Sequence, residues 1–311
     1  MSDDDDDPEH FQKHRLTMVL AFAAVYVIWG STYLAIRVGV RSVPPLLLSG
    51  CRFVGAGGLL YAFLRARGTR TPTPAEWGHA AVAGLLMLTA GNGLVTWAEK
   101  QVPSNLTALL VAAVPLDMAM LDWARPGGTR PTRRVFAGIA IGVAGMSLLV
   151  SGGRHSSHET SLLAIGAVLL SGVCWSAGSL YARYGAMHRH PVMAAAQQML
   201  AGGTVMLLLA ALRGDPRAVL ATGVSTESAL ALVYLMLFGS CVAFSAFGWL
   251  VKATTPARLS TVAYVNPLVA LVLGWALLDE RLGARALAGA ALIVCAVLVM
   301  TVPTTAWARA R

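Results

Sequence analysis

The sequence predicts an all-α integral membrane protein with ten transmembrane helices, arranged as two inverted five-helix repeats. Three observations lead to this prediction: a low content of charged residues, ten long apolar blocks, and a match between the two halves of the chain. Of the 311 residues, 56% are hydrophobic and 13% are charged, whereas a soluble globular protein carries roughly 25% charged residues. A soluble α/β protein is excluded, because the apolar residues come in blocks of about 20 with the charges between them.

Each apolar block is long enough to cross a hydrocarbon core of about 30 Å as a helix. Lipid favours the helix because it offers no hydrogen bonds to backbone groups, which must then pair within the segment. The predicted spans cover residues 17–36, 44–64, 79–98, 104–123, 134–151, 162–182, 191–212, 229–250, 257–278 and 286–303.

The spans divide the chain into two five-helix domains, residues 17–151 and 162–303, with a short segment at each end. Residues 1–16 include five consecutive aspartates, which repel one another and predict a disordered acidic tail. Residues 304–311 form the second tail. Placing the N-terminus in the cytoplasm puts 15 Lys and Arg residues on the cytoplasmic side and 8 on the other. Cytoplasmic loops collect such residues, so we expect a multi-pass protein of the cell membrane with both tails in the cytoplasm.

The two halves match at scarce residue types, which chance would rarely align in order. The earlier helices correspond at an offset of 146 residues and the later ones at 152. The matched pairs include Trp29 with Trp175, Pro45 with Pro191, Trp97 with Trp249, Pro115 with Pro267, and Trp123 with Trp275. Because five helices is an odd number, the second half enters the membrane from the opposite side. Inverted repeats recur in secondary transporters, where the substrate site lies near mid-membrane between the repeats; channels also contain them.

Four stretches of the chain resemble the EamA-type drug/metabolite transporter superfamily. They are VYVIWGSTYLAIRVG in the first predicted span, SGCRFVGAGGLL in the second, TALLVAAVPL in the fourth, and STVAYVNPLVALVLGWALLDERLGARALAGAALIV across the last two. The resemblance covers residues 17–303 as two EamA-type domains. It implies ten helices, cytoplasmic termini and the exchange of metabolites across the inner or plasma membrane. Many members of the superfamily export amino acids or toxic compounds.

Two features depart from the pattern of the superfamily. Members often carry an acidic–basic pair after both the fourth and the ninth span. Here Glu280 and Arg281 follow the ninth span, but no such pair follows the fourth. Asp117 comes after Pro115 in the fourth span, where the resemblance leads us to expect an apolar or aromatic residue. We therefore consider Asp117 a candidate for substrate selectivity.

Two charged residues lie deep in predicted spans, where a charge is costly and often marks a transport pathway. Arg52, whose second-half counterpart is Gln198, either faces such a pathway or bonds to carbonyl groups at a helix end. Asp117 has three interpretations: an ion pair with Arg52, a group that binds a proton or a cationic substrate, or a packing residue. A buried carboxylate can hold a proton closer to neutral pH than an exposed one, which would suit proton coupling.

Aromatic residues occupy one face of the first predicted span. Tyr26, Trp29 and Tyr33 follow the helical spacing i, i+3, i+7. Trp29 and its counterpart Trp175 fall near mid-membrane, whereas interfacial tryptophans lie near span ends. We expect Tyr26, Trp29 and Trp175 to line a substrate cavity, with core packing as the alternative.

Polar residues inside other spans complete the candidate substrate site. They are Asn92, Thr96, Ser240, Ser245, Tyr264 and Asn266. Hydrogen bonds between helices explain any one of them without a function. Asn92 lies in a Gly-Asn-Gly triplet and Asn266 precedes Pro267, so irregular helix geometry is expected at both places. Pro115 and Pro267 are candidate hinges.

The sequence predicts neither an enzyme nor a site for a metal or another cofactor. HExxH, GxSxG and GxxxxGK[ST] motifs are absent, so zinc-dependent, serine-dependent and nucleotide hydrolysis find no support. The four cysteines lie singly in apolar blocks, and the basic residues are dispersed over loops. This pattern argues against a zinc site and against nucleic-acid binding. Gly138, Gly142 and Gly145 predict close helix packing, either inside the chain or in a homodimer.

These observations together predict a secondary transporter that moves a small molecule across the lipid bilayer by alternating access. An amino-acid-like or amphipathic metabolite, moved outward, is the expected substrate. A proton gradient or the gradient of the substrate itself would drive transport. The alternative is a membrane protein that does not transport, such as a sensor, an assembly factor or an intramembrane enzyme.

Overall fold

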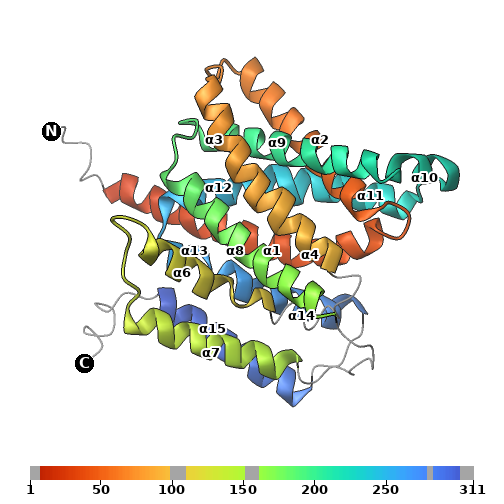
Figure 1. Ribbon diagram of the computed structural model, residues 1–311. Helices are drawn as coiled ribbons and strands as arrows, with labels where there is room; N and C mark the ends of the chain where they lie inside the picture. Colours follow the sequence, from red (N-terminus) through yellow and green to blue (C-terminus); the bar gives the residue numbers. More distant parts are fainter. Residues whose placement is uncertain (1–7, 99–109, 151–160, 279–282, 302–311) are drawn as a thin grey trace.

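The computed structural model describes residues 8–98, 110–150, 161–278 and 283–301, which form helices joined by turns (Figure 1). No strand occurs within these ranges. The all-α class predicted from the apolar blocks is therefore confirmed.

Helices in the described part of the chain overlap the predicted apolar blocks, but α1 begins at Pro8, so residues 8–16 of the tail that the sequence predicted to be disordered are helical. In the first half they are α1 (Pro8–Gly39), α2 (Pro45–Ala66), α3 (Pro74–Gly84), η2 (Leu85–Asn92), α4 (Gly93–Ala98), α6 (Val114–Ala124) and α7 (Arg133–Val150). In the second half they are α8 (Leu162–Tyr184), α9 (Pro191–Leu212), α10 (Asp215–Thr222), α11 (Thr226–Tyr234), η3 (Leu235–Val242), α12 (Ala243–Ala253), α13 (Pro256–Leu259), α14 (Val262–Leu278) and α15 (Ala284–Thr301).

Proline and capping residues set the starts of several helices. Pro45, Pro74 and Pro191 stand at the first helical positions, where the missing N–H costs no intrahelical hydrogen bond. Before α3, Thr73 and Glu76 form a capping box. The Thr73 backbone N–H donates to Glu76 Oε2 over 2.8 Å, and the Glu76 N–H donates to Thr73 Oγ1 over 3.3 Å.

Six helical segments within the described ranges are long and apolar enough to cross a membrane. They are Arg15–Ile36, Pro45–Ala66, Pro74–Ala98, Leu162–Tyr184, Pro191–Leu212 and Thr226–Ala253. The other four predicted spans overlap the shorter helices α6, α7, α14 and α15, of 11, 18, 17 and 18 residues, and residues 104–109 of the fourth predicted span lie outside the described residues. The chain is therefore a multi-pass membrane protein.

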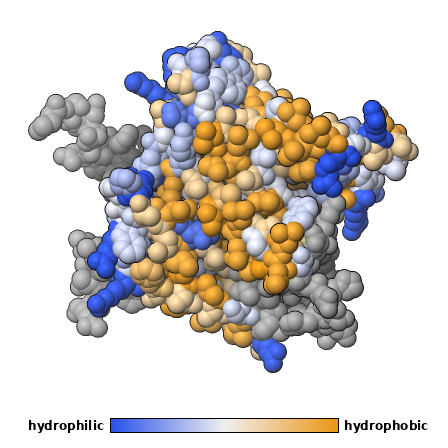
Figure 2. Space-filling model, in the orientation of Figure 1, coloured by the Kyte–Doolittle hydropathy of each residue, from blue (hydrophilic) through white to orange (hydrophobic). Residues whose placement is uncertain are grey.

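The molecular surface fits a lipid environment. Figure 2 shows a face covered mainly by hydrophobic residues, with hydrophilic residues gathered toward its edges. Large apolar side chains such as Leu59, Leu170 and Leu208 are 51%, 52% and 59% exposed. Extensive apolar surface of this kind is rare on soluble monomers, and acyl chains would cover it in a bilayer.

Two long helices contain π-helical turns at corresponding places. The segment η2 continues α3 into α4, and η3 continues α11 into α12; they begin at residues 85 and 235. Segments of π-helix are rare and occur frequently at functional sites. Asn92, where the sequence predicts irregular geometry, is the last residue of η2.

Helices of the two halves pack against each other in corresponding pairs. α2 lies along α9, and α7 lies along α15 at the lower edge of Figure 1. α1 contacts α14 and α12, just as α8 contacts α6 and α4. Exchanging each helix of the first half for its counterpart in the second half therefore maps these contacts onto one another.

The glycine ridge of α7 is buried inside the chain. A Cβ atom at Gly142 would lie 2.5 Å from Cζ of Tyr264, and one at Gly145 would lie 2.9 Å from the Gly289 carbonyl oxygen. Gly138 is in equally close contact with Met300 of α15. The ridge is therefore packed against other helices of the same chain.

Candidate functional site

Four aromatic rings from both halves of the chain meet inside the bundle, and we call them the aromatic cluster. Trp29 of α1 contacts Trp175 of α8 edge to face, with ring centroids 5.7 Å apart and planes at 76°. The ring of Phe247 on α12 lies 5.0 Å from Trp29 and 5.5 Å from Trp175, and Phe244 lies 6.5 Å from Trp29. Such tilted and edge-to-face pairs are the arrangements that aromatic quadrupoles favour. The two phenylalanines are buried, whereas both tryptophans are only partly buried.

The π-helical segment η3 meets the aromatic cluster and the buried arginine. Trp29 Nε1 donates to the Gly239 carbonyl over 3.0 Å, and Arg52 Nε donates to Ser240 Oγ over 2.8 Å. A Cβ atom at Gly239 would lie 2.9 Å from Arg52 Nη2 and 3.0 Å from Thr32 Cγ2. A larger residue at this position would therefore shift the guanidinium of Arg52.

Arg52 links α2 to η3 and is 6% exposed. Its Cζ also lies 4.9 Å from the ring centroid of Phe53. Within the described ranges, no carboxylate lies at ion-pair distance from Arg52. A buried cation without a counter-charge is unfavourable for stability alone, so Arg52 remains a candidate for the substrate pathway.

Asp117 lies on α6 and faces α8. A Cβ atom at Gly172 would lie 2.9 Å from Asp117 Oδ2. Asp117 and Arg52 form no ion pair with each other in the structure, which excludes one of the three interpretations of Asp117 and leaves the other two. Residues 112–113 form a turn immediately before α6, so the helix is interrupted next to Pro115.

Two tyrosines of the candidate site have different surroundings. The Tyr26 hydroxyl lies 2.7 Å from Thr261 Oγ1, joining α1 to the start of α14 beside the aromatic cluster. Tyr264 faces the other way: its ring packs on Gly142, and its hydroxyl donates to the Ile139 carbonyl over 3.4 Å. Tyr264 belongs to a second core cluster between α7, α14 and α15.

The remaining polar candidates divide into bonded and unbonded side chains. Thr96 donates to the Asn92 carbonyl of its own helical segment over 2.8 Å, which needs no function. Ser245 and Asn266 are 8% and 7% exposed, and neither Ser245 Oγ nor Asn266 Oδ1 has a hydrogen-bond partner within the described residues. These two oxygens are therefore available to a ligand or to water. The side chain of Pro267 lies outside the described residues.

The structure thus brings together Trp29, Trp175, Arg52 and Ser240, whereas Tyr264 and Thr96 are engaged elsewhere. The sequence did not single out Phe244, Phe247 or Gly239. Phenylalanine is common in apolar spans and carries no positional signal, but the Gly239–Ser240 pair interrupts an apolar run and could have drawn attention.

Asp122 is a carboxylate near the end of the fourth predicted span, residues 104–123. It is 3% exposed and accepts from the Tyr184 hydroxyl over 2.9 Å and from Thr129 Oγ1 over 2.8 Å. Arg125 lies 3.4 Å away and stacks over the Tyr184 ring, 3.6 Å from its centroid. With its oxygens occupied, Asp122 fixes the end of α6 to the end of α8.

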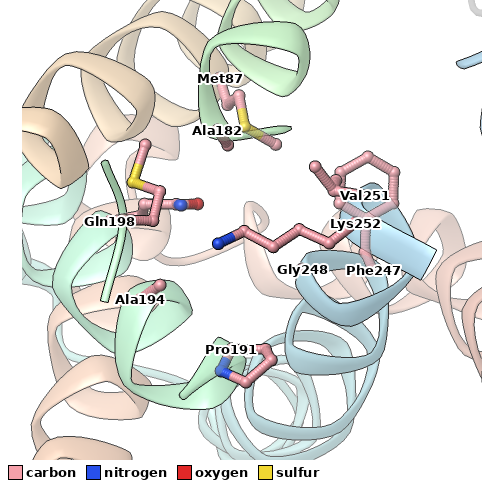
Figure 3. A pocket seen from close by; sticks show the side chains of 10 residues that line it. Met87, Ala182, Pro191, Ala194, Gln198, Phe247, Gly248, Val251 and Lys252 are labelled. Atoms are coloured by element: carbon pink, nitrogen blue, oxygen red, sulfur yellow. The ribbon is translucent and has the colours of Figure 1, made fainter. Parts of the chain in front are cut away.

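A small pocket opens beside the aromatic cluster, where α8 ends, α9 begins and α12 ends (Figure 3). The pocket is narrow and partly open to the outside. The lining residues are Met87, Ala182, Met187, Pro191, Ala194, Gln198, Phe247, Gly248, Val251 and Lys252. Phe247 belongs to both the pocket and the aromatic cluster. Across the described ranges, no three His, Cys, Asp or Glu side chains lie close enough to hold a metal ion.

Comparison with known proteins gives consistent matches along the chain. The EamA-like transporter family matches twice, over residues 16–151 and 162–302. The chain is similar to the "Uncharacterized inner membrane transporter YedA" of Escherichia coli K12, with 42% identity over 284 residues, covering 90% of this chain and 89% of YedA.

Two further relatives carry names that state a substrate class. The "Probable terminal-alkyne amino-acid exporter" of Streptantibioticus cattleyicolor is 30% identical, with 91% of this chain and 92% of the exporter covered. The "Probable amino-acid metabolite efflux pump" of Escherichia coli K12 is 27% identical, with 89% and 91% covered. One crystal structure, 24% identical, shares the fold with a TM-score of 0.75 over 92% of this chain and 97% of the other.

Proposed function

Because the chain belongs to the EamA-like transporter family, we propose that it is a secondary carrier that exports a small amino-acid-like or amphipathic metabolite. Two relatives whose names state amino-acid or amino-acid-metabolite export support this substrate class. An apolar, aromatic centre with few polar groups also suits an amphipathic compound better than a strongly hydrated ion.

In this proposal, ten transmembrane helices form two inverted repeats with both termini in the cytoplasm. The matched positions of η2 and η3 and the corresponding helix contacts support the repeat. The start of α1 and the end of α15 lie at the same end of the molecule, on the left in Figure 1, which supports a shared side for the termini. The excess of Lys and Arg in the loops on that side supports the cytoplasmic assignment.

The observation that carries the proposal is the contact between Trp29 and Trp175. These residues correspond in the two halves of the sequence, and two residues related by a two-fold axis can touch only close to that axis. A substrate held at the aromatic cluster would therefore contact both repeats at once. Rocking of one repeat against the other would then expose this substrate alternately to the two sides of the membrane.

Asp117 is the coupling candidate in this scheme, and Pro115 and Pro267 are the hinges. Asp117 is partly buried and has no ion-pair partner among the described side chains. A carboxylate of this kind can take up and release a proton as its surroundings change. The interruption of the helix next to Pro115 supports a flexible point close to Asp117.

Flux into proteoliposomes tests the proposal. We expect purified protein to accelerate entry of at least one compound from a panel of amino acids and amphipathic metabolites, relative to protein-free liposomes. Trp29→Ala should reduce that flux, whereas Trp123→Ala should not, because Trp123 is 46% exposed on α6 and lies outside the aromatic cluster. Absence of flux for every compound with correctly folded protein would contradict a carrier.

A further inference from the structure

We propose that Lys252 and Gln198 form a subsite for the carboxylate group of a substrate with an apolar body. This inference rests on the proposed transport function and specifies the chemistry of its substrate. The ammonium group of Lys252 and the amide of Gln198 point toward each other across the pocket (Figure 3). Lys252 is the only charged residue among the ten that line the pocket within the described ranges.

The surroundings of Lys252 leave its charge available to a ligand. Within the described part of the chain, Lys252 takes part in no hydrogen bond or ion pair, and no acidic residue lines the pocket. A lysine in the last turn of a helix often serves to stabilise that helix end. Here Arg183 already occupies this role at the end of α12, because it donates to the carbonyl groups of Val251 and Thr254. Lys252 is thus free to extend into the pocket.

Gln198 supplies the second polar group of the subsite. It is 4% exposed, lies on α9, and is the repeat counterpart of Arg52. Its amide can donate to one carboxylate oxygen while Lys252 donates to the other. A single cation and one neutral amide suit a group with one negative charge, which favours a carboxylate over a doubly charged phosphate.

The remaining walls define the rest of the ligand. Met87, Met187, Phe247 and Val251 are apolar, so the part of the ligand that contacts these side chains is apolar as well. The pocket is partly open and holds only part of a ligand. Because Phe247 also belongs to the aromatic cluster, a ligand anchored by Lys252 can extend toward Trp29 and Trp175. With the termini in the cytoplasm, this subsite is the entry point for an exported acid.

Calorimetric titration of the purified full-length protein in nanodiscs tests the subsite with matched pairs of probes. Each pair consists of an acid and its carboxamide: L-leucine and L-leucinamide, L-phenylalanine and L-phenylalaninamide, phenylacetate and phenylacetamide. We expect at least one acid to bind about tenfold or more tightly than its amide. Lys252→Gln should weaken binding of that acid by about 10- to 100-fold, as for loss of a charged hydrogen bond, and leave the amide within about threefold.

Two control variants separate this effect from general damage. Lys252→Arg should keep the preference for the acid. Arg217→Gln removes one positive charge from an exposed position on α10, beyond the far end of α9, and should change nothing. Equal affinity for acids and amides, retained preference in Lys252→Gln, or no binding of any acid would overturn the subsite.

Flux measured on the same preparations distinguishes failure of the subsite from failure of the transport proposal. Transport of acids that is equally fast in wild type and Lys252→Gln would overturn the subsite and leave the carrier intact. Binding with the acid preference but without flux of any bound acid would contradict the carrier and leave the subsite standing.

Discussion

The hydrogen bond between Arg52 and Ser240 offers the sharpest energetic test of the site. Arg52 Nε donates to Ser240 Oγ over 2.8 Å and connects α2 of the first half to η3 of the second half. A double-mutant cycle measures this contact alone. Arg52→Gln is the suitable first substitution, because glutamine occupies the corresponding position, Gln198, in the second half. Ser240→Ala removes the acceptor.

The expected coupling energy follows from the charge and burial of the pair. A hydrogen bond to a charged group contributes about 1.5–3 kcal/mol in proteins generally. Interhelical hydrogen bonds in membrane proteins average about 0.6 kcal/mol and reach about 1.7 kcal/mol. Because Arg52 is charged and 6% exposed, we expect a coupling of about 1–2 kcal/mol, at the upper end of the membrane range.

Unfolding by sodium dodecyl sulfate in mixed micelles provides the free energies of unfolding for the four proteins of the cycle. The control cycle pairs Arg52→Gln with Ser147→Ala, since Ser147 is exposed on α7 and donates to a carbonyl of its own helix. That control should be additive within about 0.3–0.5 kcal/mol. A coupling between Arg52 and Ser240 no larger than the control would refute the assigned contact.

Further predictions concern the aromatic cluster, the helix packing, the carboxylates and the topology. Trp29→Ala should raise the half-saturating substrate concentration by roughly 2- to 13-fold, because an aromatic pair contributes about 0.5–1.5 kcal/mol; unchanged uptake kinetics would contradict the cluster as the substrate site. Gly84→Leu should destabilise the protein by about 1–3 kcal/mol in thermal unfolding, because its Cβ would meet a carbonyl of α9, whereas Gly58→Leu has no neighbour within 4 Å and should be tolerated. Asp117→Asn should flatten the pH dependence of transport, whereas Asp122→Asn should keep it and lower the unfolding temperature, because its carboxylate is held by two hydroxyl groups. A reporter that is active only in the cytoplasm should be active when it is fused to the C-terminus. Activity there of a reporter that works only on the outer side would contradict the proposed orientation.

Helix positions are the part of the fold that the sequence predicts best. The predicted span 191–212 coincides with α9, since bilayer thickness fixes how long an apolar helix must be. Where a helix continues beyond its apolar block, its ends differ from the ends of the predicted span. α1 begins at Pro8 rather than at residue 17, and the segment Thr226–Ala253 is longer at both ends than the predicted span 229–250. Polar residues can continue a helix into water, so hydropathy does not mark where such a helix stops.

The candidate site is only partly predictable, because a helix that is apolar on all sides has no preferred face in its sequence. Trp29 and Trp175 stood out through their scarcity and their match between the halves, and the structure places them in contact. Tyr264 was expected beside them, but the rotation of α14 turns it toward Gly142 of α7. Phe247 carried no signal, because only the approach of α12 to α1 and α8 gives this residue its place.

Counterflow in proteoliposomes tests the central claim, that the two halves form a carrier with its substrate site at the aromatic cluster. Vesicles are loaded with a high concentration of an unlabelled substrate found in the flux screen, and uptake of the labelled substrate is followed. The proposal predicts a transient accumulation of label above the outside concentration, which Trp29→Ala and Trp175→Ala reduce and Trp123→Ala does not. Equilibration without any overshoot, or an overshoot unaffected by loss of either cluster tryptophan, would contradict it.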